Sequence, residues 1–206
     1  MNYILFAVIA YLLGSIPTAV WIGKMKYGID VREHGSKNAG ATNTFRTLGK
    51  KAGIVVLSID IIKGFIASFL PFLFNVGPWQ SDALITVQIV SAISAVVGHV
   101  YPIFANFRGG KGVATSLGVI IGIHPPAAGI CIVAFLIVFI ISQYVSLGAI
   151  IASIIFPTSI YFIFKSDSIY LISFSIILAS LVIYKHRQNI QRLIAGNENK
   201  MNLFKK

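Results

Sequence analysis

The sequence predicts an all-α integral membrane protein with seven transmembrane helices. The chain of 206 residues is 56% hydrophobic, its mean hydropathy is +0.84, and only 11% of its residues are charged. A typical soluble domain has about 25% charged residues. Apolar runs recur along the whole chain, and the basic residues behind the net charge of +11 gather after alternate runs. Cationic loops beside membrane spans explain this charge better than nucleic-acid binding does.

Seven apolar segments supply the predicted spans. A spanning helix needs about 20 residues, and the first, second and sixth segments reach that length. The third, fifth and seventh are slightly short, and the fourth is the shortest because Pro125–Pro126 stops it. In chain order the segments are Tyr3–Ile22, Gly53–Asn75, Ala83–Gly98, Val113–Ile123, Ala127–Ile141, Val145–Phe164 and Ser168–Tyr184.

The distribution of basic residues predicts the topology. With the N-terminus outside, the segments 23–52, 99–112 and 185–206 lie inside and hold 15 of the 17 Lys and Arg residues. If the fourth segment did not cross, the basic tail would lie outside, against the positive-inside rule. We therefore expect seven crossings and a cytoplasmic C-terminus. We see no linker long enough to separate a soluble domain, so we expect one membrane-embedded domain over residues 1–206.

The first inside segment contains "GSKNAGATNTFR", residues 35–46. Gly35 and Gly40 allow sharp turns and close approach of a ligand, and Arg46 offers a planar fork suited to phosphate. "GSKNAG" matches half of the GxxxxGK[ST] phosphate-loop pattern, but Ala41–Thr42 replaces the other half, so no nucleotide loop is expected. An ordinary polar turn remains the alternative. Four neutral residues of the stretch are further candidate ligands: Ser36, Asn38, Thr42 and Asn43.

The second inside segment contains Gly109–Gly110–Lys111–Gly112, immediately before the short fourth span. Free backbone N–H groups at a helix start favour an anion, and Lys111 adds a positive charge. The alternative is a basic anchor at the membrane boundary. His99, at the end of the third span, is interpreted as a boundary residue that caps that helix.

The third inside segment places His186, Asn189 and Arg192 at i, i+3 and i+6. On a helix continuing from the seventh span they would share one broad face. A basic amphipathic tail on anionic lipid is the alternative. Within the spans, Asp60 and Lys63 are three residues apart and would face the same way, either as a structural ion pair or with a direct role.

Some patterns argue against other chemistries. The inside segments have only three carboxylates, Asp30, Glu33 and Glu198, so a dense magnesium site is not expected. None of the four histidines is followed by an aspartate in a His-x-x-x-x-Asp pair, the usual signature of coenzyme-A-dependent glycerolipid acyltransferases. The single cysteine, Cys131, lies in an apolar run and is interpreted as a packing residue.

Taken together, five stretches resemble the bacterial acyl-phosphate:glycerol-3-phosphate acyltransferases, the PlsY family. They are "GSIPTA" at 14–19, "GSKNAGATNTFR" at 35–46, "DIIKG" at 60–64, "GHVYPIFANFRGGKGVAT" at 98–115 and "HRQNIQRLIAGNEN" at 186–199. The resemblance implies a seven-helix enzyme of the bacterial inner membrane with its active site on the cytoplasmic side. It implies transfer of a fatty acyl group from acyl phosphate to the 1-hydroxyl of glycerol 3-phosphate, giving lysophosphatidic acid and phosphate.

The same resemblance assigns the site, except that Asn43 is proposed only from the polar residues of the first loop. The expected catalytic residues are Ser36, Arg46, Lys111, His186 and Asn189. The expected binding residues are Gly35, Asn38, Gly40, Thr42, Asn43, Gly109, Gly110, Gly112 and Ser146. The last of these is placed by position between the fifth and sixth spans, where the spacing is loose. Neither a metal nor a cofactor is expected.

The residue types in these stretches also fit this chemistry without the resemblance. Two phosphate-bearing substrates need fixed cations, and an acyl phosphate already has a good leaving group, so positioning and charge stabilisation suffice without a covalent nucleophile. His186 is interpreted as a phosphate binder rather than a general base. The competing classes are an organic-phosphate transporter or exchanger and a nonenzymatic scaffold for anionic lipid.

Overall fold

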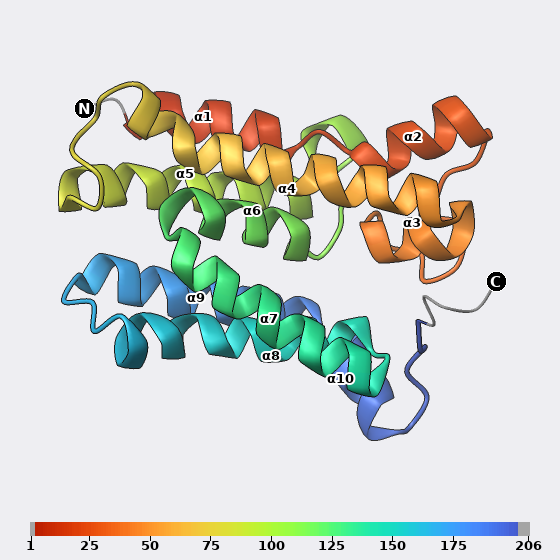
Figure 1. Cartoon of the computed structure of the whole chain (residues 1–206). Coiled ribbons are helices and arrows are strands. Elements are labelled where there is room, and N and C mark those ends of the chain that lie inside the picture. Colours follow the sequence, from red (N-terminus) through yellow and green to blue (C-terminus); the bar gives the residue numbers. More distant parts are fainter. Residues whose placement is uncertain (1–2, 202–206) are drawn as a thin grey trace. The chain divides into compact units, whose positions relative to one another are not determined.

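The structure, a computed structural model, describes residues 3–201. Its helices form two compact units, one ending at His124 and the other beginning at Pro125 (Figure 1). The boundary coincides with the Pro125–Pro126 pair, where the residue before a proline is pushed out of helical geometry.

The first unit is built on four helices packed side by side: α1 (Tyr3–Gly14), α4 (Lys50–Leu73), α5 (Asp82–Val100) and α6 (Val113–Ile123). Helix α4 contacts the other three, and α1 also packs along α5. Glycines let α4 and α6 approach closely: a Cβ at Gly64 would overlap the carbonyl oxygen of Thr115, and one at Gly118 that of Ile61. Such small-residue contacts are typical of helix packing in membranes.

The first predicted span is two helices rather than one. Helix α1 ends at Gly14 and α2 (Thr18–Tyr27) begins after Pro17. Proline lacks the backbone N–H of a helical turn and its ring clashes with the preceding turn, so the helix breaks there. The two together still form an apolar stretch of 25 residues, long enough to cross a bilayer.

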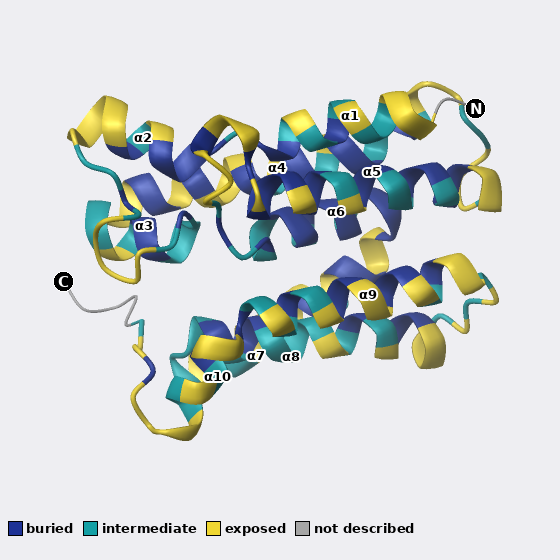
Figure 2. Ribbon diagram, turned by 180° about the vertical axis from the view of Figure 1, so that it is seen from behind, coloured by how far each residue is buried: buried dark blue, intermediate teal, exposed yellow. Residues whose placement is uncertain are grey.

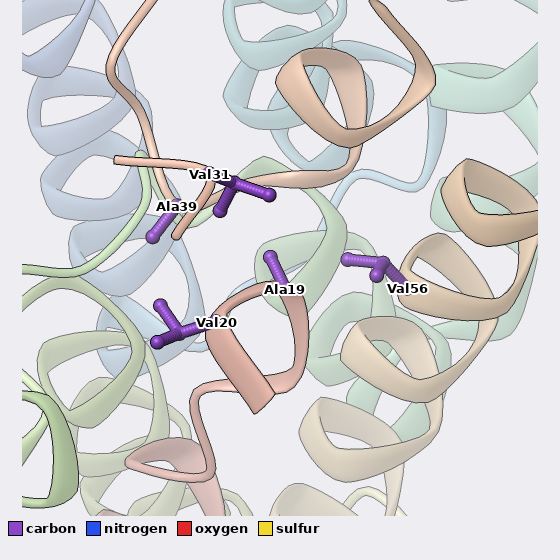
Figure 3. Packing of buried hydrophobic residues seen from close by; sticks show 5 residues of the cluster. All are labelled: Ala19, Val20, Val31, Ala39 and Val56. Carbon is purple, nitrogen blue, oxygen red and sulfur yellow. The ribbon is translucent and has the colours of Figure 1, made fainter. Parts of the chain in front are cut away.

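The loop between α2 and α3 (Ala41–Leu48) is anchored by a small apolar cluster (Figure 3). Val31 and Ala39 of the loop pack with Ala19 and Val20 of α2 and with Val56 of α4. Val31 and Val56 are fully buried. Because its two ends are held in this way, the polar stretch between Val31 and Ala39 projects from a fixed base.

The second unit contains α7 (Pro125–Ser142), α8 (Val145–Thr158), α9 (Ile169–Lys185) and α10 (Arg187–Ile194). Helix α8 packs against both α7 and α9 and continues into a π-helical turn, η2 (Ser159–Ile163). Helices α9 and α10 meet at an angle of 60°. The prediction of one continuous helix through His186 and Arg192 is therefore wrong, because the helix ends at Lys185.

Many large apolar residues of both units are exposed, as expected of a protein surrounded by lipid. Figure 2 shows exposed residues along the helices of both units. Ile54, Ile62 and Ile66 line the exposed side of α4, whereas Asp60 and Lys63 of the same helix are buried. Within residues 3–201, five helical stretches are long and apolar enough to span a membrane, and the bent α9–α10 pair would make a sixth. The all-helical membrane fold is confirmed, and α6, with its 11 residues, is a shorter apolar helix.

Candidate active site

Asn43 shapes the loop that carries Gly35 and Ser36. Its Nδ2 donates to the carbonyl oxygens of Val31 (2.7 Å) and His34 (3.1 Å), and its Oδ1 accepts from the Ser36 N–H at 2.8 Å. The side chain is 2% exposed, so these bonds are shielded from water. The predicted role of Asn43 as a phosphate ligand stays a prediction, but these contacts already engage its amide in holding the loop.

The other predicted residues of this loop lie around Asn43. Gly35 has φ of +57°, in the left-handed region that favours glycine. Ser36 is exposed, and Gly40 is the residue that precedes the first turn of α3. Thr42 and the exposed Arg46 are separated by one helical turn of α3 and therefore share a face. Asn38 is half-buried.

Arg32 connects this loop to the second predicted motif. Its guanidinium forms a bidentate ion pair with Asp30, with Nη2 2.7 Å from Oδ2 and Nε 3.0 Å from Oδ1, while Nη1 donates to the carbonyl oxygen of Ala105 at 2.8 Å. The hydrogen bond from Arg32 outweighs burial and holds the pKa of Asp30 well below its usual range. Ala105 belongs to η1 (Ile103–Ala105), the turn that leads into Gly109. Two of the three predicted motifs are thus linked within the first unit.

The second motif lies against the end of α5. The Gly109 N–H donates to the Val100 carbonyl oxygen at 3.3 Å, and the Gly110 N–H donates to the His99 carbonyl oxygen at 3.2 Å. Lys111 follows, half-buried, and Gly112, with φ of +85°, precedes the first residue of α6. His99 is 6% exposed. It is therefore a buried residue of the last turn of α5, and its expected role in capping this helix at the membrane boundary stays a prediction.

Glu198 organises the predicted residues of the second unit. Its Oε1 accepts from Ser146 Oγ at 2.9 Å and from Asn189 Nδ2 at 2.7 Å, and its Oε2 accepts from Arg192 Nε at 2.7 Å. Ser146 lies in the first turn of α8, whereas Asn189 and Arg192 lie on one face of α10. Burial alone would raise the pKa of Glu198, but the hydrogen bonds from Asn189, Arg192 and Ser146 outweigh it and keep this pKa below its usual range.

His186 sits at the bend between α9 and α10. Its Nδ1 lies 2.8 Å from the Val182 carbonyl oxygen, and the side chain is buried. A carbonyl oxygen only accepts hydrogen bonds, so Nδ1 carries a proton. In the neutral ring Nε2 is then an acceptor, and only the protonated ring presents a second N–H donor. Binding a phosphate dianion, which only accepts hydrogen bonds, through Nε2 therefore requires the imidazolium form.

The sequence and fold were compared with those of known proteins. A family profile described as glycerol-3-phosphate acyltransferase matches residues 4–196. The chain belongs to this acyltransferase family. Relatives named as glycerol-3-phosphate acyltransferases include one from Bacillus cereus, 48% identical over 205 residues with 100% of this chain and 98% of the relative covered. One from Fusobacterium nucleatum is 42% identical over 200 residues, with 97% and 98% covered.

Two crystal structures of PlsY, described as an integral membrane glycerol 3-phosphate acyltransferase, share the fold. The glycerol 3-phosphate form matches with a TM-score of 0.87 and 37% identity over the full length of both chains. The lysophosphatidic acid form matches with a TM-score of 0.84 and 36% identity, covering 98% of this chain and 96% of the other. These acyltransferase matches give no support to the alternative of a phosphate transporter.

Three contributions to this acyltransferase's candidate site were not predicted from sequence. Glu198 was noted only as a loop carboxylate, and its partner Ser146 is 52 residues away. From sequence Arg32 is only one of the 15 inside cations, although Asp30 two residues before it is a local sign of pairing. The holding role of Asn43 depends on backbone groups of a loop whose path has no helical or strand periodicity.

We predict that Glu198→Gln lowers the thermal unfolding temperature of this acyltransferase in detergent at pH 7, on the order of 5 °C, because hydrogen bonds to an ionised group are lost. The Glu198 pKa is lowered in the folded state, so its stabilisation is complete above the unfolded-state pKa of about 4.3 and is lost as pH falls through the folded value. The difference between wild type and variant should therefore shrink under acid. Glu33→Gln, at an exposed loop carboxylate, is the control. Equal unfolding temperatures for Glu198→Gln and wild type at pH 7 would contradict the prediction.

Proposed function

We propose that this protein transfers a fatty acyl group from acyl phosphate to the 1-hydroxyl of glycerol 3-phosphate. The observation that carries the proposal is the pair of glycine-rich cationic loops in the first unit, joined by the Arg32 hydrogen bond to the Ala105 carbonyl oxygen. Both expected substrates carry a phosphate, and each motif includes a cation, Arg46 or Lys111, close in sequence to glycines. The glycerol 3-phosphate and lysophosphatidic acid forms of the PlsY structures support the same acceptor and product.

The proposed step needs no covalent intermediate. The 1-hydroxyl oxygen attacks the carbonyl carbon of the acyl phosphate, and a new ester bond forms as the carbon–oxygen bond to phosphate breaks. The hydroxyl proton passes to a phosphate oxygen, so the products are lysophosphatidic acid and inorganic phosphate. Negative charge grows on the carbonyl and leaving oxygens, and fixed cations and N–H donors stabilise it.

Each predicted residue receives a role in this reaction. Arg46 and Lys111 hold phosphate oxygens, assisted by Ser36, Asn38, Thr42 and the backbone of Gly35, Gly40 and Gly112. Gly109 and Gly110, whose N–H groups donate to carbonyl oxygens of α5, hold the second loop in place. Asn43 shapes the first loop. In the second unit, His186, Asn189 and Ser146 serve the same reaction, and Glu198 orients the last two through its carboxylate. We propose that both units act as one domain over residues 1–206.

The proposal includes no metal or cofactor. The loop carboxylates best placed to bind a cation are already paired, Asp30 with Arg32 and Glu198 with Arg192. A carboxylate that neutralises an arginine is a poor ligand for a second cation, because binding must first break the ion pair. Arginine and lysine side chains instead stabilise the negative charge that develops on the reacting oxygens.

We predict that His186→Gln raises KM for a phosphate-bearing substrate more than it lowers kcat, because His186 acts as a binder in its imidazolium form. Since deprotonation removes the Nε2 donor, KM of the wild type should rise with pH, and the variant should lose this dependence. Steady-state kinetics from pH 5 to 9 test both statements. Loss of the acidic limb of the kcat profile, the fall in kcat at low pH, with KM unchanged would instead assign His186 as a general base.

We further propose seven crossings of the bacterial inner membrane, with the N-terminus outside and the C-terminus in the cytoplasm. The support is the inside placement of 15 of the 17 basic residues that this topology gives. Gln191→Cys in α10 and Gln80→Cys before α5, each in a Cys131→Ala background, test it by labelling in intact cells. Labelling of Gln191→Cys by an impermeant reagent from outside would overturn the orientation.

The reaction itself is tested with purified protein in lipid, given acyl phosphate and labelled glycerol 3-phosphate. We expect labelled lysophosphatidic acid with acyl phosphate and none with acyl coenzyme A. Product formed only from acyl coenzyme A would overturn the proposed donor, and no product from either donor would overturn the proposed reaction.

A further inference from the structure

Three ionisable side chains are buried together in the first unit and have no part in the proposed reaction. Asp60 and Lys63 of α4 are 2% and 4% exposed, and His99 of α5 is 6% exposed. Lys63 Nζ lies 2.8 Å from Asp60 Oδ1, which confirms that the two residues face the same way. Charges within a membrane span are costly and are retained where they pair or serve a function.

Two residues of this cluster form hydrogen bonds with the break between α1 and α2. Lys63 Nζ donates to the carbonyl oxygen of Ile16 at 2.8 Å, and Thr18 Oγ1 donates to Asp60 Oδ1 at 3.2 Å. The break at Pro17 takes the Ile16 carbonyl oxygen out of the helical pattern, and this oxygen accepts from the Thr18 N–H at 3.0 Å as well as from Lys63. The Asp60–Lys63 pair is therefore fixed by contacts to the α1–α2 junction.

His99 extends this fixed cluster towards the second motif. Its Nδ1 faces Asp60 Oδ1 at 3.7 Å, within reach of an ion pair but too far for a direct hydrogen bond. The opposite edge of the ring meets the backbone of Gly110 so closely that a Cβ at Gly110 would overlap His99 Nε2. The His99 carbonyl oxygen also accepts the Gly110 N–H. The imidazole thus lies between the Asp60 carboxylate and the loop.

Gly109 adds a second contact at the same place. A Cβ on this residue would overlap the His99 carbonyl oxygen, and its N–H donates to the Val100 carbonyl oxygen at 3.3 Å. The two glycines before Lys111 therefore both contact the backbone of the last turn of α5, and Gly110 also contacts the His99 ring. A larger residue at either position would displace the loop from these contacts with α5.

We infer that His99 is a positioning residue: backed by Asp60, it sets the path of the Gly109–Gly112 loop and so the position of Lys111. The inference rests on the proposed function, in which Lys111 holds a substrate phosphate. Displacing a phosphate-binding cation by about 1 Å is enough to lower a rate by about 10²-fold. We therefore expect replacement of His99 to change the rate of acyl transfer by an amount that depends on whether position 110 is glycine or alanine.

A double-mutant cycle on kcat/KM tests this coupling with wild type, Gly110→Ala, His99→Ala and the double variant. Gly110→Ala should lower kcat/KM strongly in the wild type, because its methyl group collides with the imidazole. In the His99→Ala background the methyl group has room. Gly110→Ala should therefore reduce kcat/KM by a factor at least about tenfold smaller than in the wild type, a coupling typical of residues in direct contact. Additive effects would overturn the inference.

Amide hydrogen exchange of the purified protein in lipid provides a second readout that does not need activity. His99→Ala should speed exchange in peptides covering residues 106–113, and His99→Gln, which retains a polar side chain, should restore part of the protection. The control is Gln88→Ala, which removes another buried polar side chain of α5, one that donates to the Gly122 carbonyl oxygen at 3.1 Å. It should leave this loop unchanged.

The two readouts separate the possible failures. If wild type makes no lysophosphatidic acid from acyl phosphate, the proposed function is wrong, and hydrogen exchange still decides the role of His99. If wild type is active but exchange in residues 106–113 is the same in His99→Ala, His99→Gln and wild type, the positioning role is wrong. Equal acceleration in Gln88→Ala and His99→Ala would reduce His99 to a general packing residue and also overturn it.

Discussion

Replacing Arg46 with alanine will lower kcat/KM for acyl transfer by about 10²–10³, the usual cost of removing one donor that stabilises transition-state charge. Arg46 occupies the last turn of α3, and the loop before this helix is held by the buried amide of Asn43. Its planar fork suits two phosphate oxygens at once. Arg46→Lys should recover only part of the loss, because it restores the charge without the fork.

The control for Arg46 is Lys51→Ala, which removes an exposed cation from the first turn of α4. It lowers the net charge equally and should change kcat/KM by less than about threefold, because screening in water weakens the effect of an exposed charge that holds no substrate. Thermal unfolding of each variant in detergent checks that the fold is kept. Similar activities for Arg46→Ala and Lys51→Ala would reduce the role of Arg46 to general surface charge.

Lys111→Ala should also lower kcat/KM by about 10² or more. The residue lies between Gly110, seated on α5, and Gly112, which precedes α6, so its backbone is fixed on both sides. Backbone N–H groups and the dipole at the start of α6 add to its positive charge. Lys111→Arg should retain measurable activity, since an arginine keeps the charge with a different shape.

Arg108→Ala is the matched variant for Lys111, because it removes an exposed cation three residues earlier in the same loop. We expect it to stay close to wild type in kcat and in KM for both substrates. Steady-state kinetics with each substrate varied in turn make the comparison. An Arg108→Ala defect as large as that of Lys111→Ala would show that the loop acts through its total charge.

The features that could be predicted from sequence are those with a local signal. The bounds of α6, Val113–Ile123, were predicted as they are found, because Gly112 and the Pro125–Pro126 pair mark both ends. Spacing of three residues was enough to predict the Asp60–Lys63 pair. The Pro17 break was visible in the sequence, but the apolar run continued through it and was interpreted as one helix.

The features that were missed depend on contacts between distant residues. Glu198 meets Ser146 from 52 positions away, and His99 meets Asp60 from another helix. The 60° bend after Lys185 has no proline or glycine to mark it, so the spacing of His186, Asn189 and Arg192 was interpreted on a straight helix. In the folded chain only Asn189 and Arg192 share a helix, where both reach Glu198.

The most direct test of the central claim is the stoichiometry of the reaction in the presence of a chelator. Purified protein in lipid receives acyl phosphate, glycerol 3-phosphate and excess EDTA, and both products are measured over time. Metal-free acyl transfer predicts one inorganic phosphate released for each 1-acyl lysophosphatidic acid formed, at the rate seen without EDTA. Phosphate release without acylated product, or activity that returns only when a divalent cation is added, would contradict it.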